Sequence, residues 1–561
     1  MYNLDSLSLK YLIEENAEFL KGAVVQKIQM PAKREILLSL RNLGENRKIY
    51  INVDPKFAHM NFIEHKENYS IKIPKTPPMF CMLLRKHMEG AKLWDVRVVE
   101  YERIVEFYFE IYDEIGSAVP MCLSVEFMGK HSNAILYNAS NKIIAGCVHN
   151  ISPEKSSVRE VWGGISYIYP PKQEKTDILK TSIAGFYNVL DNSVCEGFES
   201  SDLNGLLTKI SNHYYHFSKG LLGFITKKAG ADGILKPEVL FSSMQNAVSG
   251  DFTLIKEFWA QNISDEGLCL NGKKAEGCSL NSLIEKYFSY FVLKDAVETK
   301  KEHLKKLLKK ECKRCGDIIS NSLKKTSHEL NRKKGELILA NMYTPELSGG
   351  YGERVLLNGV EILLDTAKTL SENAQHYFSL YQKGKVASEI QSEREKKAKE
   401  NLEYLESILF SIENAALPDV LDEIQEELSE FLTAQKGGAK NSPAKQEKVN
   451  VESLEYKGFT IYLGKNNKQN DYLIKKVSAP EDIWLHGKDC PSSHCFIKTE
   501  NGKKPVTDEV LLYACRLVKE NSPMRESAKA SIIYTKRKFI KRPPDTHPGY
   551  VTYREEKEVV V

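Results

Sequence analysis

Two long helical segments separated by a short irregular one constrain the fold of this chain more than any other feature. The first covers residues 281–331 and the second covers about 372–415. The segment between them, about 335–370, holds a Gly-Gly pair and two short strand-like runs. Four apolar residues of the second segment follow the 3-4-3 spacing of a coiled-coil seam: Leu402, Leu405, Leu409 and Ile412. We therefore predict a long antiparallel coiled coil that carries a small insert.

The first 172 residues alternate between helical and extended patterns. A helix is predicted over 7–20, and Pro77-Pro78 opens a second helix that Gly90 closes. Runs rich in β-branched and aromatic residues predict five strands, at 24–28, 35–40, 48–53, 103–109 and 123–127. We therefore expect an α/β domain over residues 1–172.

Changes in composition mark the remaining domains. Pro170-Pro171 precedes short helices with glycine turns, which predict a small helical domain over 173–280. The helical hairpin fills 281–434, and a Gly- and Lys-rich stretch predicts a flexible linker over 435–450. Residues 451–561 read as mainly strands. Because 561 residues are too many for one core, we expect a multidomain α+β protein.

Positive charge is concentrated in a chain whose formal net charge is only +4. Residues 301–334 hold 12 Lys/Arg against 4 Asp/Glu, and residues 529–544 hold six Lys/Arg and no acid. The second segment interleaves Lys536, Arg537 and Lys538 with aromatic residues, a pattern that favours RNA. The alternatives are a solvated helix face for the first segment and a charged sheet edge for the second.

The stretch from Tyr456 to His494 combines a strand, a polar turn and an aromatic strand. The turn offers amide and ammonium donors from five residues: Lys465, Asn466, Lys468, Gln469 and Asn470. Strand alternation places Asp482, Trp484 and His486 on one face, a combination that suits stacked bases and phosphates better than a core. Lys488 and His494 extend the same candidate RNA-binding surface.

Two further polar motifs lie in the N-terminal domain. Lys130, His131 and Asn133 follow a strand and are predicted to hold phosphate or sugar groups, although an ordinary hairpin turn is the alternative. Glu102 and Arg103 directly precede another strand, where a surface ion pair of little energetic value is the alternative.

Several kinds of chemistry find no support in the sequence. There is no P-loop, no G-x-S-x-G and no H-E-x-x-H motif, and Cys312 and Cys315 lack the second pair that a structural zinc site needs. We therefore predict neither a metal nor a cofactor. With scattered cysteines, no signal peptide pattern and no membrane-spanning run, the chain is expected to be cytoplasmic and free of membrane contact.

The order of these motifs resembles the NFACT family along nearly the whole chain. Residues 456–494 and His547–Val551 resemble its C-terminal RNA-binding module, NFACT-R. Residues 126–133 and 77–90 resemble its N-terminal domain, and 335–341 with 373–378 resembles its coiled-coil middle region. The weakest match is 177–275, where the family has a helix-hairpin-helix-like domain. The resemblance also implies a glycosylase-like fold for the N-terminal domain.

The resemblance assigns tRNA recognition to three residues. The family carries an Asp-Arg pair where this chain has Glu102 and Arg103, so the match holds at Arg103 and departs by one methylene at Glu102. Asp5 matches a second acidic position near the family N-terminus.

The function implied by the resemblance is that of a ribosome-associated quality-control factor. Such a protein binds obstructed large ribosomal subunits, through rRNA and ribosomal proteins, when they carry peptidyl-tRNA. It recruits tRNA (alanyl-tRNA in bacterial relatives) so that the nascent chain receives a C-terminal tail without mRNA. A small RNA-binding helper protein is a further expected partner. The ribosome performs the peptide-bond chemistry, so the chain itself is not expected to be an enzyme.

Two alternatives come from the family's history. Related domains occur in DNA glycosylases that use an N-terminal proline amine, but this chain begins Met1-Tyr2, so removal of Met1 exposes no proline. An older family name describes a fibronectin-binding surface adhesin. With no signal peptide in the sequence, that role requires non-standard secretion.

Overall fold

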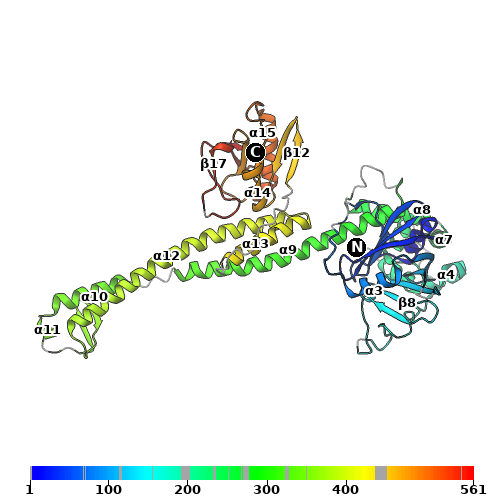
Figure 1. Cartoon of the computed structure of the whole chain (residues 1–561), viewed down its shortest axis with the longest axis horizontal. Coiled ribbons are helices and arrows are strands. Elements are labelled where there is room, and N and C mark those ends of the chain that lie inside the picture. Colours follow the sequence, from blue (N-terminus) through cyan, green and yellow to red (C-terminus); the bar gives the residue numbers. More distant parts are fainter. Residues whose placement is uncertain are drawn as a thin grey trace. The chain divides into compact units, whose positions relative to one another are not determined.

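The chain divides into two compact units, residues 1–295 and 296–561, in a computed structural model (Figure 1). The structure describes the following residues: 3–66, 69, 71–112, 116–154, 156–190, 203–230, 236–250, 252–266, 268, 277–322, 328–348, 350, 352–435, 451–544 and 546–561. The predicted linker at 435–450 lies outside the described residues apart from Gln435.

A nine-stranded sheet forms the centre of the first unit, in the order β4-β3-β2-β1-β5-β6-β7-β8-β9. Its strands are β1 (Val24–Gln29), β2 (Glu35–Asn42), β3 (Glu45–Asn52), β4 (His59–Phe62), β5 (Lys92–Val98), β6 (Ile104–Tyr112), β7 (Ala118–Glu126), β8 (Asn133–Asn138) and β9 (Ile144–Cys147). All of these neighbours pair antiparallel. The five predicted strands are confirmed. The α/β prediction for this domain is wrong, because hairpins rather than helical crossovers connect most strands.

Three helices accompany the sheet: α1 (Ser6–Glu15), α2 (Ala17–Leu20) and α3 (Met79–Met88). The helix expected over 7–20 is divided at Asn16, whose side-chain amide donates back to the Leu12 carbonyl (2.9 Å) instead of continuing the pattern. The helix after Pro77-Pro78 ends as predicted before Gly90, which has φ of 83°.

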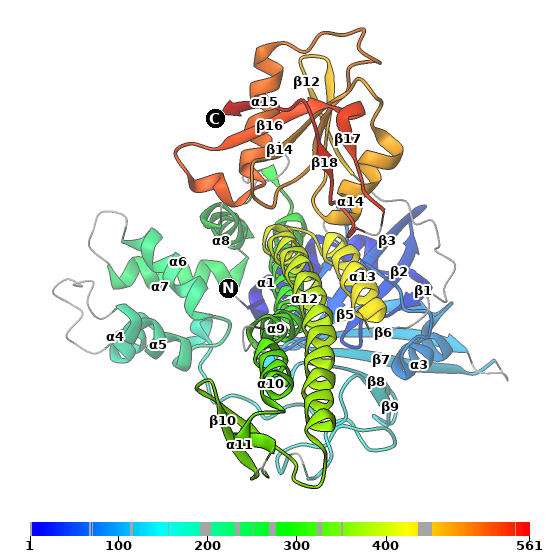
Figure 2. The same ribbon diagram turned by 90° about the vertical axis from the view of Figure 1, so that its left-hand side faces the viewer.

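Five further helices lie beside the sheet in the same unit (Figure 2): α4 (Ile183–Leu190), α5 (Leu203–His213), α6 (Lys219–Ala229), α7 (Pro237–Ser249) and α8 (Phe252–Asp265). They share one apolar core with the sheet and with the first turns of α9 (Leu280–Ser322). The buried Trp259 indole donates to the Ser8 hydroxyl (2.9 Å), and the Tyr11 hydroxyl donates to the Ala247 carbonyl (2.6 Å). These contacts fix the helical segment against α1.

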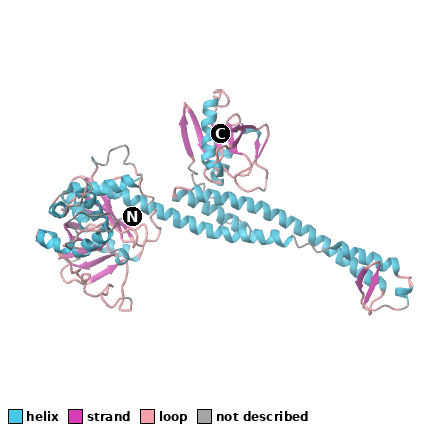
Figure 3. Ribbon diagram, turned by 180° about the vertical axis from the view of Figure 1, so that it is seen from behind, coloured by secondary structure: helices cyan, strands magenta, loops and turns pink. Residues whose placement is uncertain are grey.

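Helices dominate the first part of the second unit (Figure 3). They are the remainder of α9, then α10 (His328–Asn341), α11 (Pro345–Ser348), α12 (Leu370–Asn414) and α13 (Pro418–Gln435). Between α11 and α12, β10 (Arg354–Leu357) and β11 (Val360–Leu363) form the predicted strand pair. The four predicted seam residues all contribute to one core with α9 and α13, with Leu405 and Ile412 fully buried.

The α9–α10 segment runs antiparallel to α12. Lys305 contacts Glu413 near the end of α12 (3.1 Å), whereas the buried Gly335 lies against the ring of Phe378 near its start. Later residues of α9–α10 thus contact earlier residues of α12. A Cβ added to Gly335 would lie 3.0 Å from that ring. A side chain at this position would require the Phe378 ring to shift, so glycine allows the two helices to pack closely here.

A six-stranded antiparallel sheet forms the C-terminal domain, in the order β12-β13-β15-β14-β16-β19. Its strands are β12 (Glu452–Tyr456), β13 (Phe459–Leu463), β14 (Ile483–Gly487), β15 (Cys495–Ile497), β16 (Ser531–Lys536) and β19 (Lys557–Val560), while β17 (Ile540–Lys541) pairs separately with β18 (Thr552–Tyr553). The sheet packs against α15 (Asp508–Glu520).

Two helices correct the mainly-strand prediction for this domain. The stretch expected as a polar turn contains α14 (Asn467–Tyr472), because the Asn466 side chain accepts a hydrogen bond from the Gln469 N–H (2.8 Å) and starts the helix. The amphipathic α15, with Val510, Ala514 and Val518 buried, was not predicted.

Candidate functional site

A cavity of about 490 Å³ brings together the three residues predicted to recognise tRNA, Asp5, Glu102 and Arg103. We call it the Arg103 cavity. Its walls come from four segments of the first unit: residues 3–6, 101–103, 173–175 and 211–220. Residues more than 200 positions apart in sequence therefore face one space, and the surrounding side chains are mostly polar.

Local structure explains how the three residues reach the cavity. Asp5 is the N-cap of α1, and its Oδ1 accepts from the Ser8 N–H (2.8 Å). Glu102 and Arg103 lie in the connection between β5 and β6, where the Phe127 N–H donates to the Arg103 carbonyl (2.8 Å). The backbone at Arg103 is thus fixed while its side chain remains available.

The Arg103 guanidinium is half-buried yet makes no hydrogen bond or ion pair with any residue that the structure describes. The nearby charges of Asp5 and Glu102 only partly offset its burial, which lowers the pKa of Arg103. Nearby charges offset the partial desolvation of this guanidinium only in part, and a ligand that supplies carbonyl or phosphate oxygens offsets it further.

The two carboxylates of the cavity are also destabilised by burial. Burial raises the pKa of Asp5 to about 6, against opposing hydrogen bonds from Ser8 and the charge of Arg103. The second oxygen, Oδ2, is buried and has no hydrogen-bond partner within the described part of the chain. Burial likewise raises the pKa of Glu102, opposed mainly by Arg103. The cavity therefore offers both donors and acceptors to a ligand.

One wall of the cavity is aromatic, and sequence reasoning missed it. Tyr215 stacks on Tyr101 with ring centroids 4.4 Å apart, and His216 lies 5.3 Å from Tyr101. Tyr101 and His216 both adopt positive φ, 64° and 74°, which is strained for non-glycine residues and is typical of functional sites. Stacking surfaces of this kind bind nucleobases.

The residues of the second N-terminal motif, Lys130, His131 and Asn133, differ in their exposure. Lys130 and His131 are exposed on a short 3-10 helix, Gly129–His131, and remain available to RNA. Asn133 is buried and joins two backbone segments, donating to the His149 carbonyl (2.8 Å) and accepting from the His149 N–H (2.9 Å). The prediction of ligand contact by Asn133 is therefore wrong for this conformation.

The predicted aromatic RNA-binding face of the C-terminal domain is interior. Trp484 is fully buried among the apolar residues beside β14, with His486 stacked parallel to it and His494, also buried, at its edge. Burial lowers the pKa of both histidines, that of His486 to about 4. The expectation that the rings of Trp484 and His494 are displayed to bases is contradicted, because both residues are buried, whereas His486 is partly exposed.

Asp482 is likewise a structural residue. Its side chain is fully buried, accepts from the Ala479 N–H (2.7 Å) and the Thr499 N–H (3.0 Å), and pairs with Lys498 (2.7 Å). Asn470 is also buried, and its Oδ1 accepts from the His494 N–H (3.1 Å). A carboxylate with this many donors holds the domain together and has little capacity left for a ligand.

The remaining predicted cations of this domain have internal acidic or carbonyl partners. Lys536 and Lys538 both pair with Glu481 (2.9 Å each). Arg537 donates to the Ile474 carbonyl (2.9 Å). Two further pairs join Lys488 to Glu558 (2.7 Å) and Lys465 to Glu452 (2.9 Å). Exposed pairs of this kind are weak and exchange readily for a polyanion.

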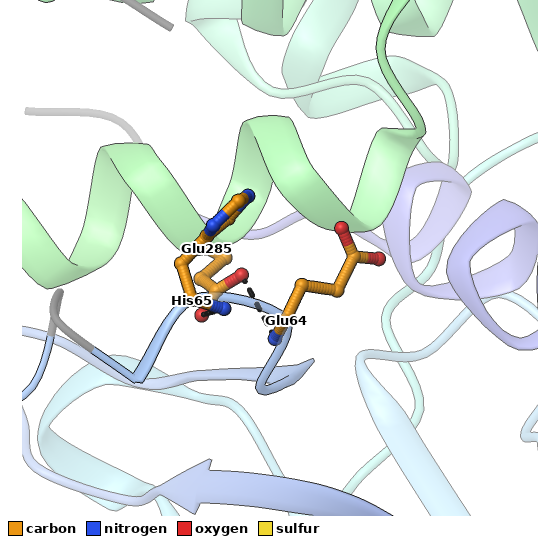
Figure 4. A group of neighbouring side chains, drawn as sticks. All are labelled: Glu64, His65 and Glu285. Atoms are coloured by element: carbon orange, nitrogen blue, oxygen red, sulfur yellow. Dashed lines mark hydrogen bonds between the residues drawn. The ribbon is translucent and has the colours of Figure 1, made fainter. Parts of the chain in front are cut away.

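Three side chains of the first unit have spacing compatible with a metal ion: Glu64, His65 and Glu285 (Figure 4). Glu285 is buried and accepts from the backbone N–H groups of Glu64 and His65 (3.2 Å each). The Glu64 carboxylate accepts from the Asn281 amide (2.8 Å). These hydrogen bonds fasten the end of β4 to the first turns of α9 and account for the group without an ion.

Comparison with known proteins assigns the family. Residues 5–447 match the model of the NFACT N-terminal and middle domains, and residues 450–555 match the NFACT protein RNA binding domain. The chain therefore belongs to the NFACT family.

Similar proteins cover the chain from end to end. The Rqc2 homolog RqcH of Bacillus subtilis (strain 168) is 30% identical over 580 residues, covering 100% of this chain and 98% of that protein. The Rqc2 homolog RqcH of Streptococcus suis (strain 05ZYH33) is 28% identical, with the same coverage. The solved N-terminal part of the fibronectin/fibrinogen-binding protein from Streptococcus suis is 25% identical with a TM-score of 0.36, covering 43% of this chain and 84% of that one.

No helix among the described residues is both long enough and apolar enough to cross a membrane.

Proposed function

We propose that this chain is a ribosome quality-control factor that binds the large ribosomal subunit and uses the Arg103 cavity to hold tRNA. The observation that carries the proposal is the unpartnered Arg103 guanidinium, which faces the same cavity as Asp5 and Glu102. Family membership over both the N-terminal and RNA-binding domains supports it.

The cavity suits an unpaired nucleotide of a folded RNA. Arg103 supplies a planar donor fork, Glu102 and Asp5 supply acceptors, and Tyr215 supplies a stacking face. Single-stranded loops are recognised by this combination of edge hydrogen bonds and stacking. Glu102 retains the acceptor of the family Asp and extends it by one methylene.

The remaining elements of the proposal follow the family. The recruited tRNA, alanyl-tRNA by analogy with bacterial relatives, extends a nascent chain on an obstructed subunit that carries peptidyl-tRNA. The protein positions tRNA, the ribosome forms the peptide bonds, and a small RNA-binding protein assists. In this scheme the antiparallel α9–α12 pair is the family's coiled coil, the domain over 1–172 is glycosylase-like in fold, and the other domains occupy 173–280, 281–434 and 451–561.

The experiment is purification of the tagged protein from stressed cells, followed by sequencing of bound RNA and identification of ribosomal proteins. Wild type is expected to enrich large-subunit RNA and one class of tRNA. Arg103→Ala is expected to lose the tRNA and keep the subunit. Arg34→Ala serves as the matched control, because Arg34 already pairs with Asp54 (3.6 Å) outside the cavity. Recovery of neither subunit nor tRNA with wild type would refute the proposal.

A further inference from the structure

The donor residues of the α14 segment contact one face of a single acidic helix, α13, within the second unit. The amides of Asn466 and Gln469 both donate to Glu423 (2.7 and 2.8 Å). The Asn467 amide donates to Glu427 (2.9 Å). The Lys468 ammonium lies 3.1 Å from Glu430 and 3.4 Å from Glu426. Four consecutive residues, three of them predicted to bind RNA, are therefore occupied by carboxylates.

The sequence of α13 explains this arrangement. Glu423, Glu426, Glu427 and Glu430 follow the i, i+3, i+4, i+7 spacing of one helix face, and the helix contains no Lys or Arg. Its apolar side packs against α9 and α12 through a separate set of residues: Val420, Leu421, Ile424, Leu428 and Phe431. The acidic face is thus left for the C-terminal domain.

The contact between α13 and the C-terminal domain has the character of a separable interface. It is formed mainly by amides, carboxylates and one ammonium, with His547 stacked on Tyr404 (4.1 Å) as an aromatic contribution. Glu427 is buried, and its Oε2 has no hydrogen-bond partner among the described residues. A buried carboxylate with an unsatisfied oxygen weakens docking. Polar interfaces of this kind resemble transient ones.

The donors covered by α13 are continuous with cations at the same end of the domain. Lys475 and Lys476 follow α14 and are exposed, and Asp471 of α14 pairs with both Lys475 (2.6 Å) and Arg542 (2.5 Å). Ammonium, guanidinium and amide donors are the groups that bind the phosphates of an RNA strand. Carboxylates of α13 occupy the positions that phosphate oxygens would take.

We propose that α13 is an intramolecular competitor for RNA: its carboxylates cover a phosphate-binding surface on α14, and RNA binding displaces them. The covered surface comprises Asn466, Asn467, Lys468 and Gln469. The inference rests on the proposed function, because it takes the ligand of this domain to be RNA. The proposal explains why residues predicted to bind RNA contact carboxylates of α13 instead, although their domain matches an RNA-binding domain.

The test is binding of a fluorescent single-stranded RNA to the full-length protein, measured by anisotropy at several salt concentrations. The variant is Glu423→Gln/Glu426→Gln/Glu430→Gln, and the matched control is Glu389→Gln/Glu393→Gln/Glu403→Gln, which removes three exposed acids of α12. The α13 variant is expected to bind about tenfold more tightly than the control. Its salt slope is expected to be steeper by about 0.7 for each additional phosphate that the protein neutralises.

A second variant keeps the proposal testable if the triple substitution perturbs folding. Glu426→Gln/Glu430→Gln changes only the two exposed acids that pair with Lys468 (3.4 and 3.1 Å), and it leaves the Asn466 cap of α14 intact. This variant is expected to bind RNA several-fold more tightly than the control Glu389→Gln/Glu393→Gln.

The outcomes separate the two proposals. Equal RNA affinity of the α13 variant and the control, with large subunits still bound by wild type, would overturn the competitor role alone. Tighter RNA binding by the α13 variant without any subunit association would support the competitor role and refute the ribosomal function. Failure of every variant to bind RNA or subunits would refute both.

Discussion

The Arg103 cavity and the α14–β14 region of the C-terminal domain are both rich in polar residues, yet they use them differently. In the cavity, Arg103 and one oxygen of Asp5 lack partners within the described chain. In the C-terminal region, Asp482 is fully bonded and Lys468 is paired with carboxylates. Residue types alone suggest RNA contact in both places. The two places differ in the hydrogen-bond and ion-pair partners of these residues: the cavity leaves groups open to a ligand, whereas other protein groups already bond or cover the C-terminal residues.

Two arginines of the same unit show the difference most clearly. Arg159 donates to both oxygens of buried Glu126, at 2.8 and 2.7 Å. Arg103 is half-buried without such a carboxylate pair. The first arginine stabilises the sheet and the second is free to bind a ligand. Substitution of Arg159 should therefore lower stability and spare tRNA binding, whereas substitution of Arg103 should weaken tRNA binding and spare stability.

The largest effect is expected for Trp484→Ala. Removal of a fully buried indole should lower the free energy of unfolding of the C-terminal domain by about 3–5 kcal/mol. Denaturant titration followed by circular dichroism measures this loss. RNA affinity per folded molecule should stay unchanged, and a selective loss of RNA binding with intact stability would show that the indole contacts the ligand.

Asp5→Asn should stabilise the first unit in a pH-dependent way. The pKa of Asp5 is raised from 3.8 to about 6 in the folded state, so burial of the charged form costs about 3 kcal/mol above pH 6. That cost is absent below pH 3.8, where the carboxyl is protonated in both states. Asparagine keeps the N-cap. Denaturant melts at pH 7.5 and pH 4 should show a gain at the higher pH only, and an equal gain at both would contradict this account.

Tyr215→Leu should weaken tRNA binding about tenfold, since loss of stacking on one base costs about 1–3 kcal/mol. Tyr215→Phe, which keeps the ring and loses the hydrogen bond to the Gln173 carbonyl (2.5 Å), should bind within about twofold of wild type by the same stacking argument. Anisotropy with labelled tRNA distinguishes the two variants. Equal losses in both would assign the effect to the hydroxyl rather than to the ring.

The smallest effect is expected for Lys130→Ala. Lys130 is exposed beside the sheet end that carries Arg103, so its loss should reduce RNA affinity about two- to threefold and lower the salt slope by about 0.7–0.9. Asn133→Ala should instead lower thermal stability, because Asn133 bonds the backbone at His149. An effect of Asn133→Ala on RNA affinity without loss of stability would reverse this assignment.

Local patterns in the sequence predicted most of the secondary structure. The helix at 79–88, the N-terminal strands and the two long helices follow from periodicity and from proline and glycine positions. The antiparallel order of the sheet was not predictable in this way, because strand pairing depends on distant segments. The short α14 was missed because its polar residues resemble a turn and its start depends on the Asn466 cap.

The candidate site was predictable only in part, for the same physical reason. Glu102 and Arg103 stand out as a charged pair before a strand, whereas Tyr215 and His216 reach the cavity from a segment more than 100 residues away. The positive φ of His216 cannot be predicted from the amino-acid sequence around it. Asp482 and Trp484 could likewise be excluded as ligand-binding residues only once the structure showed that they are buried, with Lys498 paired to Asp482 and His494 packed against Trp484.

The most direct test of the account is tRNA binding by purified Arg103→Ala, with Arg159→Ala as the comparison and thermal unfolding measured on both. Loss of an unpaired guanidinium should weaken tRNA binding about 10- to 100-fold and leave stability unchanged or slightly higher. Loss of Arg159 should cost about 3–5 kcal/mol of stability, because it leaves Glu126 buried without its cation, and leave tRNA affinity intact. Undiminished tRNA binding by a folded Arg103→Ala protein would contradict the central claim.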